Sequence, residues 1–167
     1  MTTRQVKIKK LTPENFNPYG SCLDIVNPTG YELTGTYHTF YRDVVRWVPG
    51  NLDPICLSSL IVRKNAEFIC TGMEYHDHTE EIQLPVDTDA VLFIAPANGG
   101  DLCPDEVEVF HVPAGTLLCL RRGTWHDVMY PMTADSISVL IGLPERVYHN
   151  DLVWKDFEDT QIQAVFE

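Results

Sequence analysis

The chain has 167 residues, 44% of them hydrophobic, which fits one globular domain with its own core, so we expect a single domain over residues 1–167. Its formal net charge of −12 argues against nucleic acid and anionic membranes as partners, because phosphate groups are bound by clustered Lys and Arg. No apolar run reaches the roughly 20 residues that a membrane helix needs, so we expect no membrane segment.

The first element expected along the chain is a short helix. Thr12 is a good N-cap and Pro13 fits the first turn, so a helix should begin there. Six later segments are short, rich in β-branched and aromatic residues and bounded by turn-forming residues, which is typical of strands. They are residues 54–64, 67–76, 90–95, 107–112, 115–120 and 136–142. Short strands at even spacing predict an all-β barrel or sandwich.

The chain has five cysteines, none in a Cys-x-x-Cys pair, and they indicate the redox state of the cellular compartment. Three of them lie in apolar runs, which is typical of buried free thiols in a reducing environment. Because the N-terminus also lacks the apolar stretch of a signal peptide, we expect a cytoplasmic protein.

Histidines and a carboxylate indicate a metal site. His76 and His78 are two residues apart, so on a strand both imidazoles point to one face, and Glu81 returns after a tight bend. His126 would complete the set from a different strand. Imidazole and carboxylate ligands suit a divalent transition metal such as Zn, Mn, Fe or Ni better than Ca. A His-x-His pair alone is more often solvated or hydrogen-bonded, so the prediction depends on the second segment.

The two segments resemble the two cupin motifs. Gly115, Arg121, Gly123 and His126 have the spacing of the second motif, with Arg121 in the place of a proline. Residues 72–81 resemble the first motif, although the Glu comes one residue early and the closing glycine is absent. The resemblance implies a cupin-type β-barrel, also called a double-stranded β-helix or jelly roll.

Within the cupins, residues 7–145 resemble the ureidoglycolate lyases of allantoin breakdown. The matching elements are Leu11 to Gly20, Tyr37-His38, Glu74-x-His76, Glu81, Pro85 and Trp125-His126. The resemblance implies cleavage of (S)-ureidoglycolate to glyoxylate and urea, and a homodimer. An unpaired sheet edge would also favour pairing of two copies. Those lyases typically lack a second histidine and have Gln in place of Glu81, so this chain has a fuller ligand set.

This reaction needs a group that fixes the substrate carboxylate, a base for the hydroxyl proton and an acid for the departing nitrogen. A metal ion could bind the carboxylate and hydroxyl oxygens together. Glu74 shares strand parity with His76, so it is the candidate general base, and an exposed strand-end carboxylate is the alternative interpretation. We count His126, a predicted ligand, as catalytic as well.

Substrate-binding residues are predicted in three places. Strand alternation would send Arg121 or Arg122 inward, where a guanidinium could clamp the substrate carboxylate, although the two could also form a soluble surface pair. The lyase resemblance adds Tyr37 and His38, whose alternative role is structural hydrogen bonding. Trp125 would form a wall beside His126 or stack on the substrate.

Two other functions stay open at this stage. The same cavity could belong to a non-catalytic cupin that binds a small acid, but such a sensor would normally have a DNA-binding segment. The fuller ligand set also fits a metal-dependent isomerase or dioxygenase that acts on a small hydroxy or oxo acid.

Overall fold

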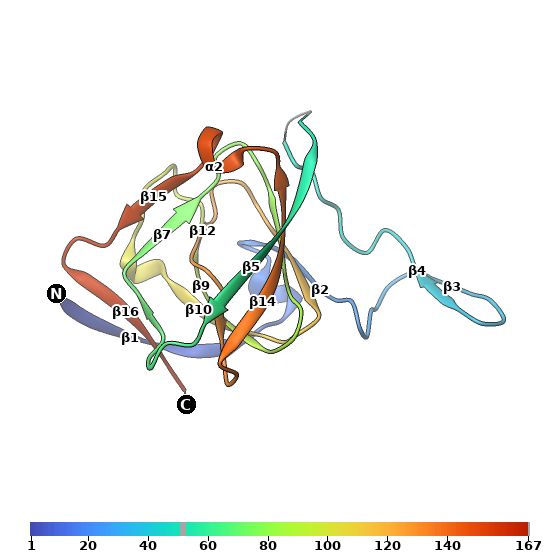
Figure 1. Cartoon of the computed structure of the whole chain (residues 1–167), viewed down its shortest axis with the longest axis horizontal. Coiled ribbons are helices and arrows are strands. Elements are labelled where there is room, and N and C mark those ends of the chain that lie inside the picture. Colours follow the sequence, from blue (N-terminus) through green and yellow to red (C-terminus); the bar gives the residue numbers. More distant parts are fainter. Residues whose placement is uncertain (51–52, 167) are drawn as a thin grey trace.

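Two curved sheets form most of the molecule in the computed structural model, which describes residues 1–50 and 53–166 (Figure 1). The nine-stranded sheet contains, in sheet order, β15 (Val153–Asp156), β7 (Gly72–Tyr75), β12 (Trp125–His126), β9 (Ala90–Ala95), β10 (Glu108–Val112), β1 (Thr2–Lys10), β16 (Thr160–Val165) and β6 (Ile69–Cys70), and β13 (Tyr130–Pro131) pairs with β9. The five-stranded sheet contains β2 (Gly20–Asp24), β11 (Thr116–Leu120), β8 (Glu81–Pro85), β14 (Ser136–Pro144) and β5 (Ile55–Arg63). The helical pieces are α1 (Pro13–Phe16), η1 (Pro104–Glu106) and α2 (Val147–Asn150).

The main core lies between the two sheets. The nine-stranded sheet contributes Leu92, Ile94 and Phe110, and the five-stranded sheet contributes residues such as Leu118 and Val139. A second core covers the other face of β9, where Val91 and Phe93 pack against Val109, Trp125 and Ile162. Because successive residues of a strand point to opposite faces, a strand with core on both sides must be apolar throughout, as Ala90–Ala95 is.

The short N-terminal helix closes one end of the main core. Thr12 is its N-cap, and the Thr12 and Asn15 side chains form a capping box. Phe16 is fully buried, and its ring lies 5.9 Å from that of Phe110. The prediction of an all-β, cupin-type barrel with a short N-terminal helix is confirmed.

The predicted strands agree with the structure except for residues 67–76. This segment is split into β6 and β7, because β6 pairs with β16 whereas β7 pairs with β12 and β15. Strands β1, β2, β8, β12, β13, β15 and β16 were not predicted, and neither were the two strands of the hairpin described below. In β1 only one face is partly buried, and the other consists of polar or charged residues that give little strand signal.

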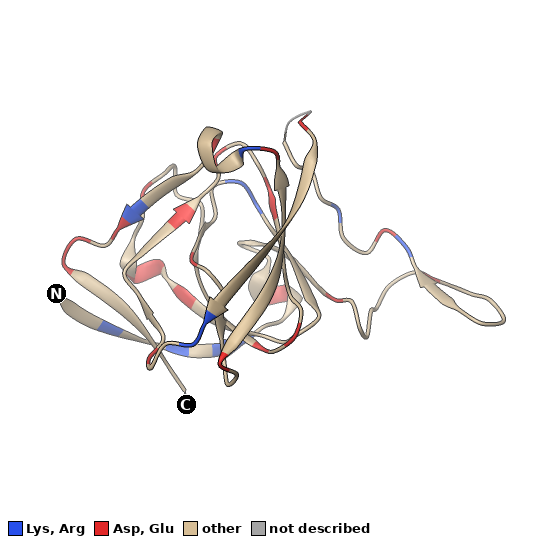
Figure 2. Ribbon diagram, in the orientation of Figure 1, with Lys and Arg blue, Asp and Glu red and all other residues tan. Residues whose placement is uncertain are grey.

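A hairpin projects from the barrel beyond β2 (Figure 1). It consists of β3 (Glu32–Thr34) and β4 (Thr39–Tyr41), which pair with each other. Tyr31, Leu33, Tyr37 and Phe40 are all exposed along this hairpin arm. Acidic residues are spread over strands and loops around the barrel (Figure 2). Within the described residues, no helix has the length and apolarity to cross a membrane.

Candidate active site

Glu74, His76, Glu81 and His126 meet inside the barrel. Glu74 on β7 and His126 on β12 are partners in the antiparallel register, so both side chains leave the same face of the sheet. His76 follows β7, and Glu81 begins β8 in the opposite sheet. One ligand atom each of Glu74, His76 and His126 lies within 4.8 Å of the other two. Glu81 Oε2 lies 3.0 Å from His76 Nε2 and 3.1 Å from His126 Nε2.

Backbone carbonyls fix the orientation of both imidazole rings. His76 Nδ1 lies 2.8 Å from the carbonyl oxygen of Asp151, and His126 Nδ1 lies 3.0 Å from that of Thr124. A ring that donates through Nδ1 presents the lone pair of Nε2 when it is neutral. In the neutral rings, both Nε2 lone pairs therefore face the Glu81 carboxylate, so acceptor atoms face one another with no donor between them. Among the described residues, buried His126 Nε2 has no hydrogen-bond partner despite its closeness to Glu81.

This donor set fits a divalent transition metal. Metal-bound histidines usually donate the second ring nitrogen to a carbonyl or carboxylate, as His76 and His126 do. Ligand atoms about 2.0–2.2 Å from one ion lie roughly 3 Å apart, similar to the Glu81–histidine distances. His76, Glu81 and His126 are all nearly inaccessible to solvent. Without an ion, they form a costly buried group of acceptors unless an imidazole is protonated.

The pKa values show how the metal-free group is balanced. Burial alone would lower the pKa of His126, but the Glu81 and Glu74 carboxylates outweigh burial and raise it to about 9. Burial alone would raise the pKa of Glu81, but the neighbouring imidazoles of His126 and His76 hold it well below its usual range. Burial raises the pKa of Glu74, although His126 opposes the effect. A metal ion would take the place of the His126 proton as the neutralising charge.

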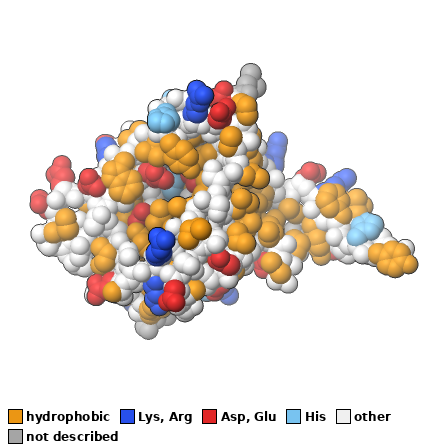
Figure 3. Space-filling view, viewed as in Figure 1, with side chains coloured by type: hydrophobic (Ala, Val, Ile, Leu, Met, Phe, Trp, Pro, Cys, Tyr) orange, Lys and Arg blue, Asp and Glu red, His pale blue; other side chains and the backbone are white. Residues whose placement is uncertain are grey.

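A cavity of about 270 Å³ opens beside these residues. It is lined by Ser58, Ser59, Leu60, Glu74, Glu81, Gln83, Asp127, Val128, Met129, Val139, Ile141, Leu143 and Tyr148. Three of these side chains are carboxylic acids, and no Lys or Arg is among the lining residues that the structure describes. Figure 3 shows a hollow below α2 in which acidic and histidine atoms are visible. The cavity is suited to a small ligand with hydrogen-bond donors, together with a cation.

His78 does not join the buried group. Its side chain is 76% exposed, and its backbone N–H donates to the Asp151 carboxylate. The prediction that it shares a face with His76 was wrong because β7 ends at Tyr75, before the alternation could reach residue 78. The predicted ligands that the structure brings together are therefore His76, Glu81 and His126, with Glu74 beside them.

Neither predicted arginine lines the cavity. The Arg121 guanidinium donates to the Asn17 carbonyl and side chain at the surface, and Arg122 is exposed. Strand β11 ends at Leu120, so alternation does not send either arginine inward. The carboxylate clamp predicted from the sequence is absent from the cavity lining that the structure describes.

The other predicted substrate-binding residues also lie elsewhere. Trp125 points away from His126 into the second core, where its ring lies 4.4 Å from that of Tyr75 and its indole N–H donates to the Asp101 carbonyl. Tyr37 is 97% exposed on the hairpin arm, and His38 is exposed beside it. None of the three lines the cavity.

Several site residues were missed by the sequence analysis. Gln83 follows Glu81 by two residues on β8, so strand parity could have placed it in the cavity. Asp127 and Tyr148 line the cavity without any motif that would reveal them. Asp151 supplies the carbonyl that orients His76, and its carboxylate accepts hydrogen bonds from Asp77, His78 and Thr79. This contact between segments far apart in sequence has no local signal.

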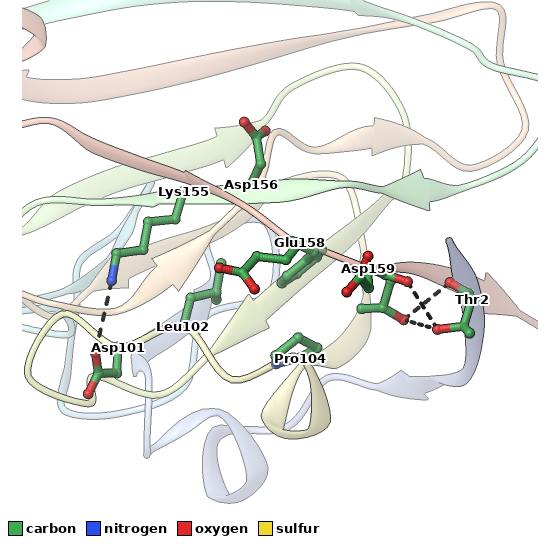
Figure 4. A pocket seen from close by; sticks show the side chains of 10 residues that line it. Thr2, Asp101, Leu102, Pro104, Lys155, Asp156, Glu158 and Asp159 are labelled. Carbon is green, nitrogen blue, oxygen red and sulfur yellow. Dashed lines mark hydrogen bonds and ion pairs between the residues drawn. The ribbon is translucent and has the colours of Figure 1, made fainter.

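A larger hollow of about 730 Å³ lies on the outside of the barrel (Figure 4). Asp101, Asp156, Glu158 and Asp159 make it acidic, and Lys155 lies 4.0 Å from Asp101. Among the described residues that line it, none is a histidine and no charged group is buried. It therefore lacks the ligand set found inside the barrel.

The fold and the buried histidine–carboxylate group define a small cupin-type barrel with a candidate metal centre. The chain belongs to the ureidoglycolate lyase family, because the family model described as "Ureidoglycolate lyase" matches residues 3–163. No curated protein matches it in a sequence search.

Solved structures with a similar fold include oxalate decarboxylase from Bacillus subtilis, which is 14% identical with a TM-score of 0.42. That match covers 63% of this chain and 24% of the decarboxylase chain. The 7S globulin of Momordica charantia is 13% identical with a TM-score of 0.39, and the match covers 62% of this chain and 27% of the globulin. The chain spans about a quarter of the length of these proteins.

Proposed function

We propose that this protein cleaves (S)-ureidoglycolate to glyoxylate and urea, with a divalent metal ion held by His76, Glu81 and His126. The observation that carries the proposal is the family match over residues 3–163, in a chain whose buried ligand group borders a small cavity. The positive charge for an anionic substrate would have to come from the ion held by this ligand group, because no Lys or Arg is found in the described lining.

The metal and the surrounding residues have separate tasks. When bound, a Zn, Mn, Fe or Ni ion supplies positive charge for the substrate carboxylate and lowers the pKa of the substrate hydroxyl. The Asp151 and Thr124 carbonyls hold the two imidazoles in place, and Gln83 donates to Glu81 Oε1 over 2.9 Å. These contacts keep the ligand atoms directed at one point before any ion arrives.

Glu74 is the group that we assign to proton transfer. It is the most exposed of the four residues, with 26% of its side chain accessible, and it lies on the cavity wall. Its carboxylate would take the substrate hydroxyl proton as the C=O bond forms and the C–N bond breaks. The electron pair of that bond goes to the urea nitrogen, to which Glu74 can return the proton. Burial raises its pKa, which helps Glu74 to hold the proton after accepting it and to return it to the departing nitrogen.

The test is an assay of glyoxylate and urea release from (S)-ureidoglycolate by metal-free protein and by protein loaded with Zn, Mn, Fe or Ni. We expect turnover with at least one metal. Changing Glu74 to Gln should lower kcat by about 100-fold or more, with a small effect on KM, since general acid–base catalysis contributes about 10²–10⁴. A protein that holds its metal and releases no urea would contradict the lyase proposal and favour the isomerase or dioxygenase alternative.

We also propose a cytoplasmic location. All five cysteines are free, and Cys70 and Cys119 are buried as thiols. Free thiols of this kind are typical of a reducing compartment.

A further inference from the structure

Gln83 has a buried side-chain amide on the cavity wall, and this amide takes no part in the proposed proton transfer. It lies on β8 and is only 4% exposed. Its Nε2 donates to Glu81 Oε1, but its Oε1 is buried and meets no hydrogen-bond donor among the described residues. A buried acceptor without a donor is costly, and most such groups in proteins have a partner.

The orientation of the amide follows from its neighbour. If the amide were reversed, Oε1 would face the Glu81 carboxylate, and two acceptors would be in contact. The hydrogen bond from Nε2 to Glu81 Oε1 therefore sets the direction of the side chain. The unpaired group is the carbonyl oxygen, and it can be satisfied by a donor that enters the cavity.

The surrounding wall shows what kind of ligand would supply this donor. Glu74, Glu81 and Asp127 add further acceptors, whereas no Lys or Arg is present in the described lining. Gln83 Oε1 is a neutral acceptor, as are the hydroxyls of Ser58, Ser59 and Tyr148, but it is the buried one without a donor, and a neutral acceptor suits an uncharged N–H. A ureido group offers such N–H donors next to a carbonyl.

We propose that Gln83 Oε1 accepts a hydrogen bond from an N–H of the substrate's ureido group, which makes Gln83 a specificity-determining residue. This inference rests on the proposed lyase function and deepens it. Gln83 would distinguish a ureido acid from a keto acid of the same size, because only the ureido acid can satisfy the buried carbonyl oxygen.

The test compares two carboxylic acids that lack the reactive hydroxyl. Ureidoacetate and 4-oxopentanoate have the same skeleton, but the second has methyl and methylene groups in place of the two nitrogens. Binding to metal-loaded protein is measured by calorimetry. Wild-type protein should bind ureidoacetate about tenfold more tightly or better, since one unpaired buried group is relieved. In the Gln83→Met variant, the two affinities should agree within about twofold.

The ratio of the two affinities separates ligand recognition from a purely structural role. If Gln83 only oriented Glu81, the Met variant would bind metal and both acids more weakly, but the ratio would stay as in the wild type. Gln161→Met is the matched control, because Gln161 lies on β16 outside the cavity and bonds to Thr3. Three outcomes would overturn the inference. The affinity ratio of the two acids could be near one in the wild type, it could be unchanged in Gln83→Met, or both acids could fail to bind.

Ureidoglycolate turnover by the wild type is measured separately. Turnover without the predicted preference would overturn the role of Gln83 and leave the lyase function standing. A Gln83-dependent preference without turnover would overturn the lyase function and leave the role of Gln83 in ligand recognition standing.

Discussion

His76 and His78 illustrate how sharply two similar residues can differ. Both come from one His-x-His sequence, yet His76 is buried against Glu81 and His78 is 76% exposed. The difference arises because the chain leaves the strand geometry at Tyr75 and bends around the Asp151 carboxylate. Residue type and spacing therefore indicated a metal site, while the bend decided which histidine takes part.

This difference provides a matched pair of variants. His126→Ala should abolish binding of a transition metal, because it removes a buried ligand atom that faces Glu81. His78→Ala should keep the metal at wild-type stoichiometry. Metal content is measured after dialysis by elemental analysis, with circular dichroism to confirm the fold. Full retention of metal by His126→Ala would contradict the ligand assignment, as would its loss from His78→Ala.

Metal affinity should rise with pH in the neutral to alkaline range. In the metal-free protein the pKa of His126 is raised to about 9, so an ion has to displace its proton below that pH. We expect affinity to increase by up to about tenfold per pH unit between pH 7 and 9, and to level off above pH 9. Competition with a chelator of known affinity at each pH measures this slope. An affinity that is flat from pH 7 to 9 would contradict a protonated His126.

The stability of the metal-free protein should follow the opposite trend. A histidine whose pKa is raised on folding stabilises the fold fully below its unfolded pKa of about 6.5, and this contribution is lost as pH rises through about 9. The midpoint of thermal unfolding of metal-free protein should therefore fall between pH 7 and 10. Metal-loaded protein should show a smaller fall, because the ion replaces the proton.

At the scale of elements, the apolar interiors of several strands could be predicted and the strand ends could not. Ala90–Ala95 was found from an apolar run that burial on both faces selects, and Ile55–Arg63 from its β-branched and apolar residues, although none of these is fully buried. The errors at His78 and Arg121 share one cause, because each residue lies just beyond the last residue of a strand, where alternation no longer applies. Asp151 was missed because the contact that gives it a role joins segments more than 70 residues apart.

Asp151 links the loop between β7 and β8 to the end of α2. Its carboxylate accepts from the N–H groups of Asp77 and His78 and from the Thr79 hydroxyl, so Asp151→Ala would leave three donors without this partner. We expect unfolding in urea to require about 1–3 kcal/mol less free energy, together with weaker metal binding. Asp105→Ala is the control, because the Asp105 side chain is 89% exposed and its ion pair with Arg4 is long. Equal stability of the two variants would contradict the proposed role.

At the scale of the whole molecule, the hairpin arm and β5 present apolar side chains to solvent. Phe40 on the arm is 57% exposed and Leu57 on β5 is 69% exposed. β5 is an edge strand of its sheet, and residues 54–62 contain no charged side chain in a chain of net charge −12. A surface depleted of charge is where two such acidic chains can approach each other.

We therefore expect a homodimer that uses this surface. Light scattering should give about twice the chain mass of 19.0 kDa for the wild type. Leu57→Lys combined with Phe40→Lys should shift the protein toward the monomer, because it adds charge to the contact. Val86→Lys, at a 58% exposed valine just after β8, should leave the dimer intact. A wild-type protein that stays monomeric at all concentrations would refute this expectation.

With three carboxylic acids in the cavity and no Lys or Arg in its described lining, the proposed metal and an anionic substrate would bind interdependently. Without the cation, the cavity would repel a negatively charged ligand, and an anionic ligand would in turn strengthen retention of the cation. By thermodynamic reciprocity, the two raise each other's affinity by the same factor. A cell that is short of metal would then contain enzyme molecules that neither turn over nor sequester their substrate, so metal supply would control how much of the substrate pool stays free.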